Sequence, residues 1–225
     1  MPLGKNNTDA DVIFAVLDLL YRIKLNFLNH LSQINQFPIG INAVWQKASQ
    51  YTLNDQHLAD WLLNTGSLTE RLQALTSNFE VKVLGQATID ADASEKAALA
   101  DYEHHKWQIR EVILFGDGKP WVFARSILPE HLCKTTWSTL GNQPLGQRIF
   151  NDDNFVRSEF VITQLNKNPL SGIDANARDG ELWGRRSAFK IKDWHLLVAE
   201  VFLPDCPSYL KQPVLNGSEK NESLK

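Results

Sequence analysis

A change in the spacing of apolar residues near Phe79 limits the folds open to this chain more than any other feature. From Phe79 onward apolar residues alternate with a period of two, which is typical of β-strands. Short turns, instead of long crossover segments, separate most of these runs, and such connections favour antiparallel pairing. We therefore expect an antiparallel sheet with strands at residues 79–84, 107–115, 121–128, 155–163, 183–191 and 195–203.

Helical spacing marks the region before the sheet. Residues 8–31 repeat apolar side chains at helical positions behind a cap at Thr8, and predict a long amphipathic helix. Three roles stay open for its apolar face: packing on the main domain, binding a partner, or lying on a membrane, although its polar face is not strongly basic. Residues 35–41, with Pro38 and Gly40, are expected to form a linker.

Two shorter helices are expected next. Residues 55–63 read as a helix, and Ser67 with Glu70 forms a capping box that starts another. The pair has the shape of a helix-turn-helix, but Arg71 is the only basic residue in its second helix, so we interpret it as a hairpin packed on the sheet and not as a DNA reader. A further short helix is expected at residues 145–150, behind Pro144.

Length and charge exclude several classes of protein. A chain of 225 residues, 43% hydrophobic, suffices for one domain with a sizeable core. We place an N-terminal helical extension and linker at residues 1–50, the main domain at 51–210 and a disordered polar tail at 211–225. The net charge of -3 and pI near 6.1 argue against general nucleic-acid binding. Without a leader peptide or a run of roughly 20 apolar residues, we expect a cytoplasmic protein with no stable membrane insertion.

No pattern of metal ligands or cofactor contacts is found. Cys133 and Cys206 lie far apart in the sequence and are expected to be reduced thiols. His104 and His105 are adjacent, which is a poor geometry for one metal ion, and no His-Glu-x-x-His pattern occurs. The chain also lacks a phosphate-binding loop and a Gly-x-Ser-x-Gly elbow. Any chemistry is therefore expected to run without a metal or cofactor.

Two charged residues interrupt strands that otherwise read as buried. They are Arg110, in the run 107–115, and Glu200, in the run 196–203. Because side chains alternate between faces, Glu200 shares its face with apolar residues such as Val198 and Phe202, where a lone carboxylate is costly. Charge kept on an apolar face indicates a site. The alternative for Glu200 is a buried salt bridge with no chemistry.

The turn at residues 116–119 predicts which residues face each other. If Asp117 and Gly118 form a two-residue type I′ hairpin loop, the numbers of paired residues add to 235, and Arg110 faces Arg125. Directly opposed like charges destabilise a hairpin, so we expect an anion between them, such as a dicarboxylate ligand. Alternatively, Glu200 or Asp152 neutralises one arginine while the other reaches water.

Three other charged strand residues are interpreted as structural. Glu111 points to the face opposite Arg110 and is expected to be a half-buried surface carboxylate. Arg185 and Arg186 are adjacent and must diverge on a strand. We expect water to solvate one of them and the other to hold the sheet edge or a loop.

Five blocks of sequence, in order over roughly residues 60–209, resemble the chorismate pyruvate-lyase family, whose members make 4-hydroxybenzoate for ubiquinone synthesis. The blocks are residues 109–121, 124–125, 143–150, 182–187 and 199–204. The resemblance implies a single-domain α+β fold with a six-stranded antiparallel sheet and two helix-turn-helix flaps over an internal ligand cavity. Relative to shorter members, the first fifty or so residues have no counterpart, and residues 165–177 look like an inserted loop.

The resemblance also implies roles for individual residues. The arginine that matches Arg110 holds the product carboxylate, and the glutamate that matches Glu200 holds the phenolic hydroxyl. Backbone at Leu145 adds a contact, and Leu68 forms an apolar wall at a position where methionine also occurs in the family. Arg125, from the hairpin register, is expected to hold the enolpyruvyl carboxylate of the substrate.

The activity implied is the elimination of pyruvate from chorismate to give 4-hydroxybenzoate, by a monomer whose partners are substrate and product. Glu200 either orients the ring hydroxyl or acts as a general acid or base. One alternative is a non-catalytic sensor domain for an aromatic acid, because a related fold binds effectors in some bacterial regulators. Another is a scaffold that hands 4-hydroxybenzoate to a membrane enzyme through the helix at residues 8–31.

Overall fold

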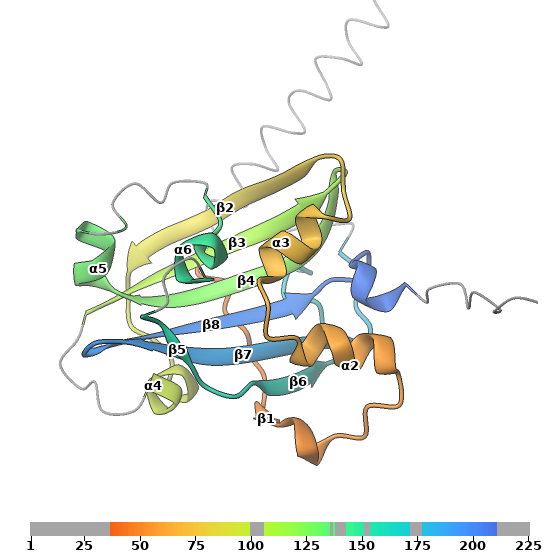
Figure 1. Ribbon diagram of the computed structural model, residues 1–225, viewed down its shortest axis with the longest axis horizontal. Coiled ribbons are helices and arrows are strands. Elements are labelled where there is room, and N and C mark those ends of the chain that lie inside the picture. The colour runs from red at the N-terminus through yellow and green to blue at the C-terminus, as the bar shows by residue number, and fades with distance from the viewer. Residues whose placement is uncertain are drawn as a thin grey trace, which may run out of the picture.

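One antiparallel sheet forms the body of the molecule. The structure is a computed structural model that describes residues 37–99, 106–135, 137, 143–150, 154–171 and 177–210. In this part of the chain the sheet has eight strands, seven of them in the order β1-β6-β7-β8-β4-β3-β2, with β5 paired to β7 (Figure 1). The strands are β1 Gln46–Lys47, β2 Phe79–Thr88, β3 Trp107–Gly116, β4 Lys119–Pro129, β5 Val156–Arg157, β6 Val161–Leu165, β7 Leu182–Ile191 and β8 Trp194–Phe202.

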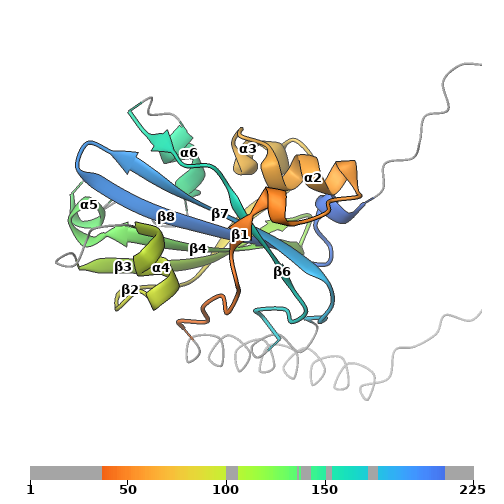
Figure 2. The ribbon, with the colours of Figure 1, turned by 90° about the horizontal axis from the view of Figure 1, so that it is seen from below.

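Short helices cover both faces of the sheet. They are α2 Gln56–Leu63, α3 Leu68–Gln73, α4 Ala93–Leu99, α5 Glu130–Lys134 and α6 Leu145–Phe150, with 3-10 turns at Ala48–Gln50 and Pro207–Tyr209. Figures 1 and 2 show α2, α3 and α6 over one face, which also carries Arg110 and is called the cavity face below. No helix in these described ranges is long and apolar enough to cross a membrane.

The α+β class and the antiparallel sheet predicted from the sequence are confirmed. The expected count of six strands is wrong, partly because residues 155–163 do not form one strand. In an uninterrupted antiparallel ladder the numbers of paired residues have a constant sum. The sum is 346 between β5 and β7 but 347 between β6 and β7, so one extra residue interrupts the ladder. The interruption lets Arg157 and Phe160, three positions apart, both face the same cavity.

The helix pair α2 and α3 follows from local sequence. The side chain of Asp55 accepts hydrogen bonds from the backbone of His57 and Leu58 and so caps α2. Ser67 accepts from the backbone of Glu70 and caps α3, as the capping box predicts. Both helices bury apolar side chains, such as Trp61, against the sheet in one core cluster.

Residues 37–47 belong to the main domain, although the sequence places them in the extension and linker. Ile41 is part of a buried cluster on the face opposite the cavity, called the rear face below, and β1 pairs with β6. The backbone N–H groups of Ile39 and Gly40 both donate to Glu111 at 2.8 Å. The predicted helix at 8–31, the tail at 211–225 and His104 and His105 lie outside the described residues.

The predicted register of the β3–β4 hairpin is wrong beyond its first two pairs. Asp117 and Gly118 both have positive φ, as a type I′ turn requires, and Gly116 faces Lys119. The register then shifts between Leu114 and Phe115, and paired numbers add to 236 from there on. A residue inserted on one strand moves every later side chain to the other face. Arg125 therefore lies on the rear face.

Candidate functional site

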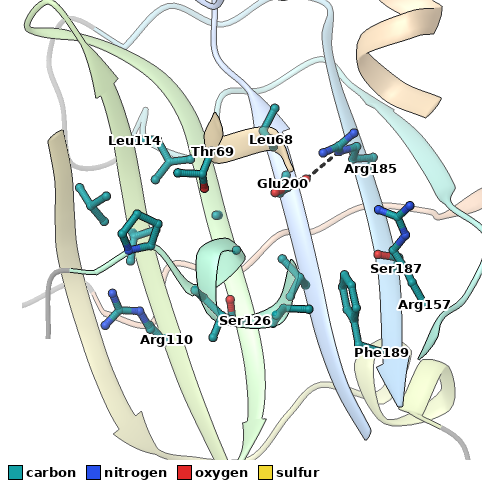
Figure 3. Close-up of a pocket in the computed structure, with 18 of the residues that line it drawn as sticks. Leu68, Thr69, Arg110, Leu114, Ser126, Arg157, Arg185, Ser187, Phe189 and Glu200 are labelled. Atoms are coloured by element: carbon teal, nitrogen blue, oxygen red, sulfur yellow. Dashed lines mark hydrogen bonds and ion pairs between the residues drawn. The ribbon is translucent and has the colours of Figure 1, made fainter. Parts of the chain in front are cut away.

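A cavity lies between the cavity face of the sheet, α3 and α6. Among the described residues, its floor comes from alternating positions of β3, β4, β7 and β8, and its cover from α3 and from residues 144–146 and 149 (Figure 3). The space open to the centres of water molecules is about 60 Å³. Its walls are mainly apolar: Val81, Val112, Leu114, Ala124, Ile149, Phe160, Phe189 and Val198.

Arg110 marks one end of this cavity. Its residue surface is 2% exposed, and its guanidinium group donates to Gln86 Oε1 at 3.0 Å and to the backbone oxygen of Gln143 at 3.2 Å. The first contact comes from the neighbouring strand β2, where Gln86 pairs with Arg110. Burial lowers the pKa of Arg110 from its ordinary value, yet an arginine stays charged at neutral pH. A fixed cation on an apolar floor is well suited to bind a carboxylate.

Glu200 lies toward the opposite end, paired with an arginine. The register of the β7–β8 hairpin sets Arg185 directly opposite Glu200, and Arg185 Nε donates to Glu200 Oε2 at 2.6 Å. Among the described residues no donor binds the other oxygen, Oε1. The Glu200 side chain is 17% exposed, against 3% for Arg185. One oxygen of a well-oriented carboxylate is thus available to accept a hydrogen bond from a ligand.

Arg185 also ties this end of the cavity to the first flap, which comprises α2, α3 and the turn between them. Its Nη1 donates to the carbonyl oxygens of Trp61 at 2.9 Å and Asn64 at 3.0 Å, at the C-terminal end of α2. A cation at that end interacts favourably with the helix dipole. Arg185 and Arg186 are 3% and 8% exposed, so the prediction that water solvates one of them is wrong.

The two flaps meet over the cavity. Leu68 and Thr69 begin α3, and Leu145 and Gly146 begin α6, called the second flap below together with Gln143 and Pro144. All four of these helix residues line the cavity. A Cβ atom added to Gly146 would lie 3.0 Å from Thr69 Oγ1, so the helices approach closely here. The two flaps therefore cover part of the apolar floor.

Arg125, predicted to bind substrate, is part of a buried ionic network on the rear face instead. It donates to Glu95 at 2.6 and 3.1 Å and to Glu111 Oε1 at 2.7 Å. Hydrogen bonds and charge from the two carboxylates raise its pKa against the opposing effect of burial. Glu111 is fully buried, so its interpretation as a surface carboxylate is also wrong. Both errors follow from the register shift in β4, because Glu111 faces Arg125.

Four of the predicted site residues lie together and one does not. Arg110, Glu200, Leu68 and Leu145 line one cavity, whereas Arg125 is absent from its lining. Sequence reasoning missed Arg157, which also lines it, and misassigned Arg185. The turn between β7 and β8 indicates which residue faces Arg185. With Lys192 and Asp193 as loop residues, an uninterrupted ladder places Arg185 opposite Glu200, as observed.

The cavity can hold a small, flat, anionic molecule between apolar walls. Arg110 supplies a cation at one end, and Glu200 supplies an acceptor for a hydroxyl group at the other. In the part of the chain that the structure describes, no group of three or more His, Cys, Asp or Glu residues is arranged to hold a metal ion.

Comparison with known proteins gives related sequences over most of the chain. A family model described as chorismate lyase matches residues 39–214. The probable chorismate pyruvate-lyase of Pseudoalteromonas atlantica is 41% identical over 178 residues, which cover 77% of this chain and 92% of that protein. The probable chorismate pyruvate-lyase of Shewanella amazonensis is 38% identical over 186 residues, covering 79% of this chain and 96% of that protein.

One solved structure shows a weaker likeness. PhnF from Mycobacterium smegmatis aligns with a TM-score of 0.48 and 16% identity, over 64% of this chain and 66% of that chain. At this score the likeness supports no argument about function.

Proposed function

Because this chain belongs to the chorismate lyase family, we propose that it is a chorismate pyruvate-lyase and that the cavity between the sheet and the two flaps is its active site. The reaction converts chorismate into 4-hydroxybenzoate and pyruvate, the first committed step of ubiquinone biosynthesis. One observation carries the assignment of the site: Arg110 and Glu200 line the same apolar cavity from opposite sides of its floor (Figure 3).

Arg110 binds the ring carboxylate of chorismate. The bonds from its guanidinium group to Gln86 and to the backbone of Gln143 fix its orientation before the substrate arrives. Such preorganisation supports a bidentate contact with a carboxylate. The bond to Gln143 also links Arg110 to the second flap, so the carboxylate site is complete only when that flap is closed. Leu145, in the same flap, lines the cavity and covers the ring of the substrate.

Glu200 binds the hydroxyl group at the far side of the ring. Arg185 holds one oxygen of the carboxylate, and the hydroxyl donates to the other. With both ends of the ring held and with Leu68 covering its face, the substrate has little freedom to rotate. Positioning of this kind can supply a large share of a rate enhancement.

The elimination breaks the bond between the ring carbon and the ether oxygen of the enolpyruvyl group. The hydrogen on the neighbouring hydroxyl-bearing carbon passes as a proton to the methylene carbon of the departing enolpyruvyl group, and the electrons of the broken C–H bond complete the aromatic ring. The ether oxygen leaves with the three-carbon unit as the new carbonyl oxygen, and the transferred proton makes that unit pyruvate. No electron acceptor is needed, and aromatisation makes the step favourable. In this proposal Glu200 orients the hydroxyl group and transfers no proton.

The closed flaps are expected to slow the release of product. The walls and cover that exclude water from the reaction also enclose 4-hydroxybenzoate after pyruvate has formed, so the flaps must open before it leaves. We expect the enzyme to act as a cytoplasmic monomer without a cofactor.

The proposed activity is tested by incubating the purified protein with chorismate and a chelator and following pyruvate and 4-hydroxybenzoate together. The two products should appear in equal amounts. Arg110→Ala should abolish most turnover and weaken product binding, because it removes the cation but leaves the fold's apolar floor. Absence of turnover by the wild-type protein would contradict the activity, and an unchanged dissociation constant for 4-hydroxybenzoate in Arg110→Ala would contradict the assigned site.

A further inference from the structure

The cavity carries more positive charge than binding of the product requires. Among the described side chains that line it, Arg110, Arg157 and Arg185 are positive and Glu200 is negative, which leaves a net charge of +2. The product has one carboxylate, whereas chorismate has two. A second carboxylate therefore matches the remaining positive charge, and the question is which arginine receives it.

The chemistry of the substrate locates its second carboxylate. The enolpyruvyl ether is attached to the ring carbon next to the one that bears the hydroxyl group. Since that hydroxyl lies at Glu200 in the proposed function, the enolpyruvyl group must lie at the Glu200 end, away from Arg110. Figure 3 shows Arg157 and Arg185 on this side of the cavity and Arg110 across it.

The guanidinium group of Arg185 already makes several contacts with the protein at this end of the cavity. Its Nε binds Glu200, and its Nη1 binds two carbonyl oxygens at the end of α2. Moving it toward a ligand would break these contacts and leave Glu200 without its counter-ion, which is costly for a buried pair. Arg185 therefore positions Glu200 and the first flap.

Arg157 has a setting suited to a ligand anion. Its guanidinium carbon lies 4.6 Å from the centre of the Phe160 ring, and that of Arg185 lies 4.7 Å from the same ring. Burial and the nearby positive charge of Arg185 both lower the pKa of Arg157, with Glu200 opposing them. A ligand carboxylate at this end would relieve the repulsion between the two guanidinium groups.

Arg157 also lies where the cavity meets the surface. It lines both the cavity and a more open groove formed by β1, the α2–α3 turn and residues 157–160. Its Nη2 donates to the carbonyl oxygen of Thr65 in that turn at 2.8 Å. A dianion that binds Arg157 thus contacts the edge strand β5 and lies beside the first flap.

We propose that Arg157 binds the carboxylate of the enolpyruvyl group and thereby distinguishes the doubly charged substrate from the singly charged product. This inference rests on the proposed function. Arg157 replaces Arg125, which the sequence predicted for this role and which lies on the other face of the sheet. After elimination, pyruvate carries this carboxylate away, and the aromatic product keeps only its contacts with Arg110 and Glu200.

The test compares two inhibitors that differ by one carboxylate: 3-(carboxymethoxy)-4-hydroxybenzoate and 3-methoxy-4-hydroxybenzoate. Their dissociation constants are measured by calorimetry for the wild-type protein and for Arg157→Gln, which removes the positive charge and keeps a polar side chain. We expect the dicarboxylate to bind about 10- to 100-fold more weakly to the variant, and the monocarboxylate and 4-hydroxybenzoate to change less than about threefold. Arg157→Lys should recover part of the loss because it keeps the charge.

Kinetics give a second readout. The kcat/KM for chorismate should fall about 10- to 100-fold in Arg157→Gln while the affinity for 4-hydroxybenzoate is retained. Arg178→Gln is the matched control, because Arg178 is exposed, pairs with Asp205 and is absent from the cavity lining. Arg178→Gln should leave the dissociation constants of both inhibitors unchanged.

The outcomes separate this inference from the activity on which it rests. If the wild-type protein turns over chorismate but Arg157→Gln weakens both inhibitors equally, Arg157 has a structural role in the flap and the inference is wrong. The same holds if the dicarboxylate is unaffected. If the wild-type protein does not turn over chorismate, the proposed function fails, and this inference fails with it.

Discussion

Arg185→Met removes a guanidinium group that joins Glu200 to the first flap. The group makes contacts of 2.6 Å with Glu200 and of 2.9 and 3.0 Å with the carbonyls of Trp61 and Asn64. Breaking a buried ion pair by removing one partner costs about 3–5 kcal/mol. Because the Glu200 side chain is 17% exposed to the cavity, water can hydrate it in part. We therefore expect the lower end of this range, a loss of about 3 kcal/mol in the free energy of unfolding.

Urea unfolding of a double-mutant cycle measures the pair itself. With Arg185→Met, Glu200→Gln and the double variant, we expect a coupling energy of about 2 kcal/mol, so that the double variant is more stable than additivity predicts. The matched control is the same cycle on Arg178 and Asp205. Their ion pair has an N–O distance of 3.1 Å, and their side chains are 68% and 41% exposed. That exposed pair should give less than about 1 kcal/mol. A coupling for Arg185 and Glu200 no larger than the control's would refute the reasoning.

Three further predictions concern the ring hydroxyl, the flaps and the response to alkaline pH. Glu200→Gln can still accept a hydrogen bond, so single-turnover rates should fall less than about tenfold; a loss of 100-fold or more would mean that Glu200 transfers a proton. Gly146→Ala crowds Thr69, because the new Cβ would lie 3.0 Å from Thr69 Oγ1. This variant should weaken 4-hydroxybenzoate binding by about 1 kcal/mol, roughly fivefold. The control Gly180→Ala, whose new Cβ would have no atom within 4 Å, should leave binding unchanged. Burial raises the pKa of the Cys206 thiol from 9.0 to about 11. The unfolded chain therefore loses this proton first, and stability that is complete below about pH 9 should fall by about 2–3 kcal/mol as the pH rises to 11. Urea unfolding at several pH values should show a shallower decline for Cys206→Ala, and an equal decline would contradict this origin.

The two long hairpins show which part of a register the sequence determines. Turn chemistry at Asp117 and Gly118 predicts the first pairs of β3 and β4 correctly. Beyond them, the register shift near Trp121 reverses the face of every later residue in β4. The ring of Trp121 occupies the space over Gly116 and belongs to the core cluster beneath α2. This packing involves residues distant in sequence, so alternation alone could not predict it.

The β7–β8 hairpin has no such shift in the pairs from its turn to Glu200. Its sequence therefore contained the pairing of Arg185 with Glu200, and the same counting from the turn would have found it. The capped helices α2 and α3 were predicted for a similar reason: Asp55 and Ser67 act on backbone groups two or three residues away. Local signals of this kind can be read from one sequence.

Features that depend on distant segments could not be predicted. Arg125 is neutralised by Glu95 from α4 and by Glu111 from β3, and no local pattern connects these residues. Arg157 was missed because residues 155–163 read as one alternating strand, which assigns Arg157 and Phe160 to opposite faces. The extra residue between β5 and β6 brings both to the cavity.

A crystal structure of the protein with 4-hydroxybenzoate tests the central claim most directly. The claim is that Arg110 and Glu200 hold the two ends of one aromatic acid inside the cavity. The account predicts the ligand carboxylate at the guanidinium group of Arg110 and its hydroxyl oxygen within hydrogen-bond distance of Glu200 Oε1. A ligand bound on the rear face, or bound in the cavity with its carboxylate away from Arg110, would contradict it.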